Sequence, residues 1–297
     1  MQVPTTLFYD GLSKRMSTLN ARATLLQTQV ATGKKLRTPS DDAVASSQIA
    51  EFKRRDADAE VYGANMDVAA SLLKQTDSTL GAMSDQIQRA MELTVQAAND
   101  TLQPEARKVM GAELRAIVDQ LVNLGNTKDL RGQPLFGSAD GTAAVQRTGA
   151  GFAFVSTTVS EIPIASGQTV QATETAARVF RSPDGGDVLT TLSELAAAFE
   201  SGAATAEDAS AALDDLTAAD DQVGTVRTSV GARAARIELS QALLVEANTD
   251  REELRSSLED VDVTAAITEL QKTITVLQAT QASFTKLTSL SLFNYLR

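Results

Sequence analysis

The stretch VTAAITELQKTITVL, from Val263 to Leu277, places an apolar side chain at every third or fourth position. This row runs with a 4, 3, 4, 3 spacing through Val263, Ile267, Leu270, Ile274 and Leu277, and Phe284 continues it. Near the other end of the 297-residue chain, FYDGLSKRMSTLNARATLLQTQV carries a second row at Phe8, Leu12, Met16, Leu19, Ala23, Leu26 and Val30. Such spacing places apolar side chains on one face of a helix and is typical of coiled coils. Both chain ends are therefore predicted to be amphipathic helices.

The two apolar rows also predict where the molecule assembles. Even when paired, they bury too few side chains to offset the conformational entropy of ordering two helices of this length. We therefore expect the ends to be loosely ordered in a lone molecule and to fold against copies or partners. The alternative is that the rows pack only within a bundle of one molecule. The candidate assembly residues are Leu12, Met16, Leu19, Leu26, Val30, Ile267, Leu270, Ile274, Leu277 and Phe284.

Helix signals continue inward from the amino-terminal end. Thr38-Pro39-Ser40-Asp41 predicts a helix start, with Thr38 as the N-cap and Pro39 in the first turn. This helix is expected to run to about Asn99, with possible breaks at Gly63 or Gly81. A further helix is predicted from Pro104 to Gly125, because its apolar positions share one face and a glycine ends it.

The middle of the chain changes character between Gly137 and Phe180, where glycine and threonine become frequent. Strands are predicted within FAFVSTTVSEIPI and QTVQATE, on either side of a Ser-Gly turn. Asp187 then predicts the cap of a short helix, and Thr205 with Asp208 marks the next helix start. A long helix of about 40 residues is expected to end near Leu258, because apolar positions keep one helical phase.

Together these elements predict a mainly α fold. The amino- and carboxyl-terminal halves are expected to form an elongated antiparallel helical bundle or coiled coil, with a small α+β insert domain in the middle. The predicted domains are terminal assembly segments at 1–40 and 259–297, a helical rod at 41–137 and 206–258, and a mixed outer domain at 138–205.

Composition excludes several classes of function. The chain has no cysteine, histidine or tryptophan, which leaves no ligands for the usual zinc or haem sites and no thiol or imidazole for catalysis. A net charge of −11 argues against nucleic acid as a partner, because phosphate binding needs a basic face. The acidic tract from Asp184 to Asp221 is interpreted as a solvated surface, since it lacks the ligand spacing of a calcium loop. No metal or other cofactor is expected.

Membrane and secretory signals are not recognisable. No apolar run reaches the roughly 18 residues of a membrane span, and the first residues lack the apolar core of a secretory signal. We expect no membrane insertion, and either a cytosolic protein or export by a route that does not read such a signal.

The sequence does not complete any of the catalytic motifs considered. Thr28 stands where a P-loop ending in Gly33-Lys34 needs glycine, and Lys35 follows where it needs Ser or Thr. The pattern S-x-x-K at Ser283–Lys286 lies within the predicted carboxyl-terminal helix, where packing of Phe284 is the simpler interpretation. Adjacent aspartates such as Asp214-Asp215 point to different faces of a helix. We predict no catalytic residues and no enzyme activity.

Several linked segments resemble one known family, the bacterial flagellins and their relatives. They follow the family's order and spacing at both ends of the chain. The segments are ATGKKLRTPSDDAVASSQIA (31–50), VYGANMDVAASLLKQTDSTL (61–80), MELTVQAANDT (91–101), LVNLGNTKDLRGQPLFGS (121–138) and VGTVRTSVGARAARIE (223–238). Within the family, SFTKLTSLSLFNYLR (283–297) and DVLTTLSELAAAF (187–199) look more like the hook–filament junction members than like filament flagellin.

The resemblance implies a structural role outside the cell. It implies export through the flagellar type III apparatus without cleavage of the amino terminus, and a cytosolic chaperone that holds the carboxyl-terminal helix until export. The implied partners are copies of the chain in a ring, hook-associated protein 1 and flagellin, with the terminal helices as an inner tube. The alternatives are filament flagellin itself, or a flagellin-like surface protein that binds a ligand through the 138–205 insert.

Overall fold

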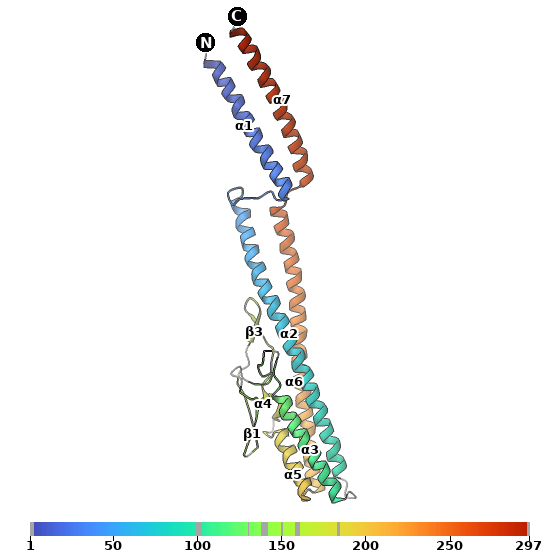
Figure 1. Ribbon diagram of the computed structural model, residues 1–297. Coiled ribbons are helices and arrows are strands. Elements are labelled where there is room, and N and C mark those ends of the chain that lie inside the picture. The colour runs from blue at the N-terminus through green and yellow to red at the C-terminus, as the bar shows by residue number, and fades with distance from the viewer. Residues whose placement is uncertain are drawn as a thin grey trace. The chain divides into compact units, whose positions relative to one another are not determined.

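Long helices dominate the computed structural model of the chain (Figure 1). The structure describes residues 3–98, 103–129, 131–137, 142–149, 151–157, 161–182 and 185–295. The helices are α1 (Val3–Thr32), α2 (Ala43–Ala97), α3 (Pro104–Gly125), α4 (Ala176–Phe180), α5 (Val188–Ser201), α6 (Ala206–Glu259) and α7 (Val263–Tyr295). The strands are β1 (Val145–Thr148), β2 (Gly151–Phe154), β3 (Glu161–Ala165) and β4 (Gln168–Gln171). α1 packs with α7 and α2 with α6, and the small hairpins lie between these halves in the sequence, which confirms the predicted fold class.

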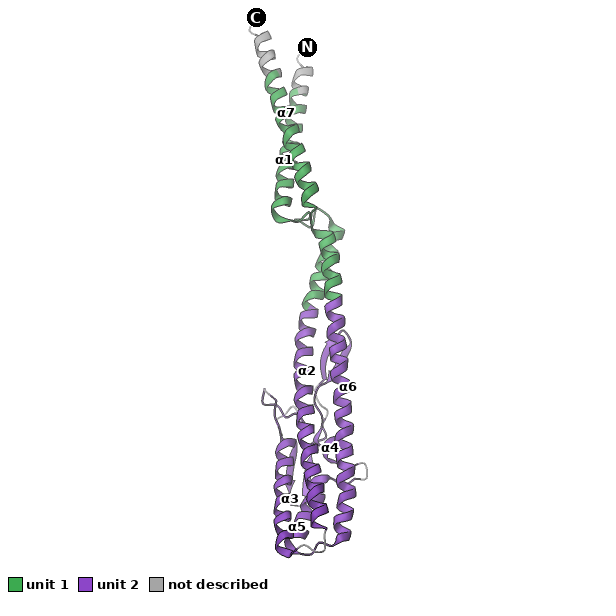
Figure 2. Cartoon of the chain, turned by 90° about the vertical axis from the view of Figure 1, so that its right-hand side faces the viewer, with its two compact units in different colours: residues 1–57, 247–297 green, residues 58–246 purple. Residues whose placement is uncertain are grey.

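The chain divides into two compact units (Figure 2). Unit 1 consists of residues 1–57 and 247–297, and unit 2 consists of residues 58–246. The first therefore holds α1, α7, the beginning of α2 and the end of α6. The second holds the remainder of α2 and α6 together with α3, α4, α5 and the strands. The three functional domains expected from the sequence stay a prediction.

The start of α2 corrects one prediction, because the helix begins at Ala43 and Thr38 is not its cap. The Oδ1 atom of Asp42 accepts hydrogen bonds from the backbone N–H groups of Val44 at 3.0 Å and Ala45 at 2.9 Å. The Oδ2 atom of Asp41 instead accepts from the N–H groups of Arg37 and Thr38, each at 2.9 Å. The predicted start signal is therefore a closed turn, and the N-cap follows it by one residue.

Neither Gly63 nor Gly81 interrupts α2, which runs unbroken to Ala97. A Cβ atom at Gly63 would lie 3.8 Å from the side chain of Leu244, and one at Gly81 would lie 3.6 Å from that of Arg227. Both neighbours belong to α6. Packing against a second helix therefore offsets the intrinsic cost of glycine in a helix.

The core of unit 2 lies between α2, α6, α3 and α5. α3 and α5 approach closely at Gly111, where a Cβ atom would lie only 2.8 Å from the carbonyl oxygen of Ala196. The predicted bounds of α3 are confirmed. The largest fully buried side chains of the core are Met66, Leu73, Leu80, Met83, Ile87, Leu93, Leu114, Leu121, Leu135, Phe136, Phe180 and Phe199.

The insert contains two separate antiparallel hairpins, β1 with β2 and β3 with β4. Three of these strands lie in the segments predicted as strands, and Gly167, with φ of 69°, makes the turn between β3 and β4. β1 and the five-residue α4 were not predicted. Both are too short to carry a periodic signal, and β1 is held by its pairing with Gly151–Phe154.

Two helix starts confirm their capping signals. The Asp187 carboxylate accepts a hydrogen bond from the Thr190 N–H at 2.8 Å and caps α5. At the start of α6, Asp208 accepts from both the N–H and the hydroxyl of Thr205, whose hydroxyl accepts from the Asp208 N–H in return. The helix that begins here continues to Glu259, so two predicted elements form one 54-residue helix.

Candidate assembly interface

The apolar row of α1 faces α7, as its spacing predicts. Leu12, Met16, Leu19, Ala23, Leu26 and Val30 are all half-buried, whereas most positions between them are exposed. The two helices lie side by side within unit 1 (Figures 1 and 2). The side chain of Phe8, the first member of the row, lies outside the described residues. The candidate assembly residues on α1 are thus brought onto one face.

The face that α7 turns toward α1 differs from the predicted row by one position. Ala266 and Thr273 are buried, at 6% and 4% exposure, although neither was predicted to lie in the contact. Leu270, Leu277 and Phe284 are half-buried and belong to both rows. Alanine and threonine are small, and their burial lets the backbones of α1 and α7 approach. Sequence reasoning passed over them because neither is strongly apolar.

Two contacts give the pairing its antiparallel register. The rings of Tyr9 and Phe284 meet edge to face, with centroids 5.8 Å apart. Farther along, Arg22 donates to the Glu269 carboxylate at 2.9 Å. Both partners of this ion pair are well exposed, so it adds about 0–1 kcal/mol and mainly fixes alignment.

An apolar ridge on α7 stays uncovered within unit 1. Its members are Val263, Ile267 and Ile274, which are 43%, 39% and 40% exposed. We call these three residues the α7 ridge. The structure therefore does not bring Ile267 and Ile274 onto α1, and it leaves two branched apolar side chains at the heptad spacing facing outward.

The connector from α1 to α2 and the connector from α6 to α7 are hydrogen-bonded to each other. The N–H of Lys35 donates to the Glu259 carbonyl at 2.8 Å, and the N–H of Val261 donates to the Gly33 carbonyl at 2.9 Å. The ammonium group of Lys34 pairs with the Glu259 carboxylate at 2.5 Å. Gly33 has φ of 72°, a left-handed conformation in which glycine is unstrained. The α1–α2 and α6–α7 connections therefore form one joint within unit 1.

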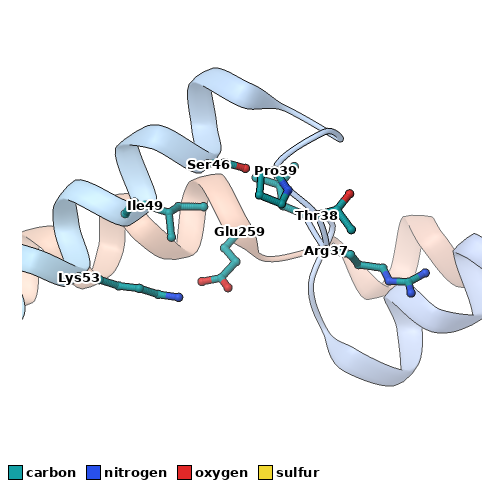
Figure 3. Close-up of a pocket in the computed structure, with 9 residues that line it drawn as sticks. Arg37, Thr38, Pro39, Ser46, Ile49, Lys53 and Glu259 are labelled. Carbon is teal, nitrogen blue, oxygen red and sulfur yellow. The ribbon is translucent and has the colours of Figure 1, made fainter.

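A shallow pocket lies beside this joint (Figure 3). Ile49 and Lys53 of α2 lie on one side of it, and Arg37 and Pro39 of the connector lie on the other, with Glu259 close by.

Hydrogen bonds from the backbone N–H groups of Thr38 and Arg37 lower the pKa of Asp41 in the connector turn. Its carboxylate is therefore held in the charged form that the turn requires.

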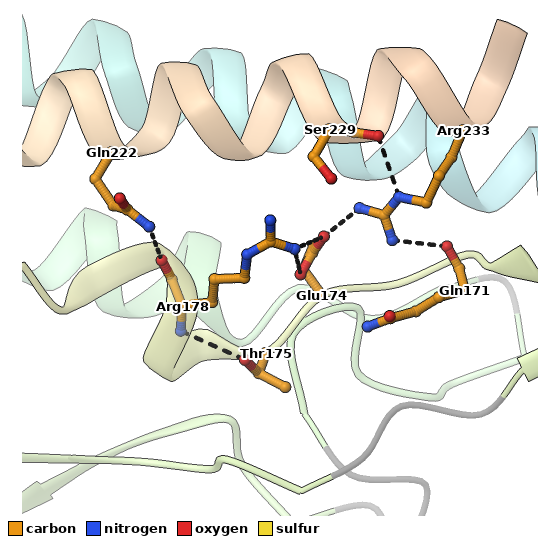
Figure 4. A network of polar contacts seen from close by, with 7 residues as sticks. All are labelled: Gln171, Glu174, Thr175, Arg178, Gln222, Ser229 and Arg233. Carbon is orange, nitrogen blue, oxygen red and sulfur yellow. Dashed lines mark hydrogen bonds and ion pairs between the residues drawn. The ribbon is translucent and has the colours of Figure 1, made fainter. Parts of the chain in front are cut away.

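A buried carboxylate joins the insert to α6 in unit 2 (Figure 4). Glu174 is 1% exposed and lies between Arg178 and Arg233. Arg178 donates to its two oxygens at 2.9 and 3.1 Å, while Arg233 pairs with it from α6 and also donates to the Gln171 carbonyl at 2.7 Å. This arrangement anchors the segment after β4 on the long helix.

The acidic tract is partly engaged in hydrogen bonds inside unit 2. Asp220 accepts from Ser84 at 2.5 Å and from Gln88 at 3.1 Å, both on α2, while Asp208 caps α6. Among the described residues, no group of three or more potential ligands is placed to hold a metal ion. In the same part of the chain, every helix is too short or too polar to cross a bilayer.

Two family models match this chain, one in its amino-terminal part and the other in its carboxyl-terminal part. The bacterial flagellin N-terminal helical region matches residues 10–142, and the bacterial flagellin C-terminal helical region matches residues 213–296. Together the two matches cover more than half of the chain and include most of the helices that form the interface.

Individual relatives differ in how much of the chain they match. Flagellar hook-associated protein 3 of Salmonella typhimurium is 28% identical over 315 aligned positions, which cover 99% of both chains. Flagellin of Listeria innocua is 25% identical over 146 positions, which cover 49% of this chain and 51% of the flagellin. The crystal structure of FlgL from Xanthomonas campestris shares the fold, with a TM-score of 0.62, 18% identity, and coverage of 69% of this chain and 99% of FlgL.

Proposed function

Since this chain belongs to the bacterial flagellin family, we propose that it is the subunit of an adaptor ring that joins the flagellar hook to the filament. The family consists of structural, non-enzymatic subunits, and membership confirms that the chain is not an enzyme. The ring would contact hook-associated protein 1 on one side and flagellin on the other, and would present a flagellin-like surface for filament growth.

The length of the similarity is the observation that carries this proposal. Hook-associated protein 3 aligns with nearly the whole of the chain, whereas the flagellin match covers about half. A junction subunit and a filament subunit share the terminal helices, and they differ in the segment that lies between those helices in the sequence. Agreement that extends through the insert therefore favours the junction role over that of filament flagellin.

The α7 ridge supports assembly through the chain ends. Val263, Ile267 and Ile274 are each about two-fifths exposed in the single chain, so neighbouring subunits gain free energy when they cover them. Because the ridge adjoins the α1·α7 contact, one helix of a neighbouring subunit can cover the ridge and contact both α1 and α7. Burial completed by neighbours would order the terminal helices at the moment of assembly.

The same exposed surface has a consequence before assembly. An uncovered amphipathic helix is prone to premature association in the cytosol. We propose that a cytosolic export chaperone covers α7, and that the chain then leaves through the flagellar type III apparatus with its amino terminus uncleaved. Its final location is the hook–filament junction outside the cell.

A deletion strain tests the junction role. Without this chain, the cells should build hooks and release flagellin into the medium without attached filaments, and the wild-type gene should restore filaments. A strain that still attaches filaments contradicts the proposal. A strain that releases no filament subunit at all, although its other flagellin genes are intact and expressed, also contradicts it and indicates the filament role.

A further inference from the structure

A groove opens along one flank of the α1·α7 pair. Its apolar lining includes Leu12 and Leu19 of α1, and Val276 and Ala279 of α7. Lys14 and Arg15 line the same groove and are exposed. Neither cation forms an ion pair with any residue that the structure describes. The groove thus combines an apolar floor with two uncompensated positive charges.

The α7 ridge is not the natural complement of this groove. On a helical wheel, Val276 and Ala279 lie on one side of the row that faces α1, and Ile267 and Ile274 lie on the other. Between Val263 and Phe284, α7 has only one acidic residue, Glu269, which already pairs with Arg22. The ridge therefore offers no negative charge to the two cations.

The end of α6 within unit 1 does offer such a surface. Asp250, Glu253 and Leu254 lie within one turn, all exposed, with Leu254 at 54%. We call these residues the acidic patch. The nearby Arg251 and Arg255 do not neutralise it, because both pair with Asp56 of α2, each at 3.0 Å. The patch thus presents one apolar side chain beside two free carboxylates.

We propose that the groove of one copy binds the acidic patch of a second copy. Leu254 would enter the apolar floor, while Asp250 and Glu253 would face Lys14 and Arg15 on the rim. This contact rests on the proposed function, since it assigns part of the self-association that a ring requires. Charge complementarity selects the occupant, because a groove with a basic rim is matched by an acidic and apolar helical face.

The groove and the patch of one molecule lie at different distances from the joint. Arg15 lies 17 residues before the end of α1 at Thr32, about 25 Å along the helix from the joint. Asp250 lies 9 residues before the end of α6 at Glu259, about 14 Å along its own helix from the same joint. These distances from the same joint differ by about 11 Å, so the two surfaces of one copy would be out of register even if α1 lay along α6, and we assign the patch that fills a groove to another copy.

The form of the contact has a consequence for assembly. The groove and the patch are different surfaces, so their pairing is heterologous and leaves one free groove and one free patch after each addition. Such a contact does not stop at a dimer. It builds a ring where the rotation closes and a helical array where it does not.

Cysteine cross-linking in flagella tests this pairing directly, because the chain has no cysteine of its own. Two variants, Arg15→Cys and Asp250→Cys, would be co-expressed in the deletion strain, and isolated flagella would be oxidised. We expect a disulfide-linked heterodimer between the two variants. The matched control combines Arg15→Cys with Asp221→Cys, another exposed aspartate of α6, and should give none.

Charge reversal gives a second readout. Lys14→Glu added to the Arg15→Cys copy should lower the disulfide yield with the Asp250→Cys copy about fivefold, and more strongly at low salt. Glu253→Lys added to the Asp250→Cys copy should restore it. Reversal of Asp214 and Asp221 should neither impair nor restore the yield.

The outcomes separate this contact from the junction role. If flagella incorporate both cysteine variants and complete their filaments, but no heterodimer forms or the control pair links equally well, the proposed contact is wrong and the junction role stands. If the wild-type chain does not enter flagella at all, the proposed function fails, and this contact fails with it.

Discussion

Thr273 and Ile274 are neighbours in the sequence, yet Thr273 is buried against α1 and Ile274 faces outward. The polar residue therefore belongs to the intramolecular contact, and the apolar one remains available to other subunits. This reverses what hydrophobicity alone suggests, and it separates the residues that pair α1 with α7 from those that are candidates for assembly.

Charge on the α7 ridge should block assembly without unfolding the subunit. Ile267 and Ile274 are about two-fifths exposed in the lone chain, so Ile267→Asp with Ile274→Asp should lower the unfolding free energy by only about 1 kcal/mol per site. Filament attachment in the complemented deletion strain should be lost. Thr268→Asp with Thr275→Asp, two exposed positions that directly follow the ridge residues but lie on another face of α7, is the control and should support attachment. Normal filaments on the ridge variant would show that the ridge has no role.

Glu174 should contribute strongly to the stability of unit 2. Glu174→Gln leaves Arg233, at 16% side-chain exposure, without its charge partner, and the unfolding free energy should fall by about 3 kcal/mol. Urea titration followed by circular dichroism measures the change. Asp77→Asn breaks the exposed pair with Arg227 and serves as the comparison, with an expected loss of about 0–1 kcal/mol. Equal losses for the two variants would contradict the anchoring role of Glu174.

The two glycines Gly111 and Gly224 should respond to alanine in opposite directions. A methyl group at Gly111 would press on the carbonyl oxygen of Ala196, so Gly111→Ala should destabilise the chain by about 1–3 kcal/mol. Nothing lies within 4 Å of a Cβ atom at Gly224, which is exposed on α6, so alanine there should stabilise by about 0.5–1 kcal/mol. Thermal unfolding of both variants checks the sign. Stabilisation by Gly111→Ala would mean that α3 and α5 are not closely packed there.

The cap of α2 should depend on Asp42 and not on Thr38. Asp42→Ala removes the acceptor for two backbone N–H groups and should cost about 1 kcal/mol. Thr38→Ala should leave the first turn of α2 intact. Hydrogen exchange of the Val44 and Ala45 amides measures the effect, and faster exchange in the Thr38 variant alone would restore the sequence-based assignment.

The start of α6 should show a defined pH dependence. Hydrogen bonds from the backbone N–H and the hydroxyl of Thr205 lower the pKa of Asp208 in the folded chain. A lowered folded pKa stabilises the native state at neutral pH, and this contribution is lost as the pH falls through the ordinary aspartate range to the lowered value. The carboxyl titration of Asp208, followed by NMR, should therefore move to higher pH in Thr205→Ala. The control Thr205→Ser keeps the hydroxyl and should not move it.

Local signals predicted much of the fold because they act over a few residues. Asp187 and the Thr205–Asp208 pair cap their helices through hydrogen bonds inside one turn, so sequence spacing is sufficient to find them. The cap of α2 was misassigned because Asp41 and Asp42 are adjacent, and both carboxylates satisfy backbone donors. Only the path of the connector decides which one begins the helix.

Long-range features were harder to predict. The role of Glu174 depends on Arg233, which lies 59 positions later and is brought to it only when the insert packs on α6. Likewise, α2 is not broken at Gly63 or Gly81, where the sequence allowed a break, because a partner helix packs against both glycines. Neither outcome has a signature within a window of neighbouring residues.

The amino-acid order by itself determined that both chain ends are helices with an apolar face, because a repeat of three and four residues is a property of one helix alone. It also determined the family, through segments matched at both ends. Only the tertiary structure decided which part of the α7 apolar face meets α1. Close approach of two backbones favours small side chains such as Ala266 and Thr273, and this turns Ile267 and Ile274 outward.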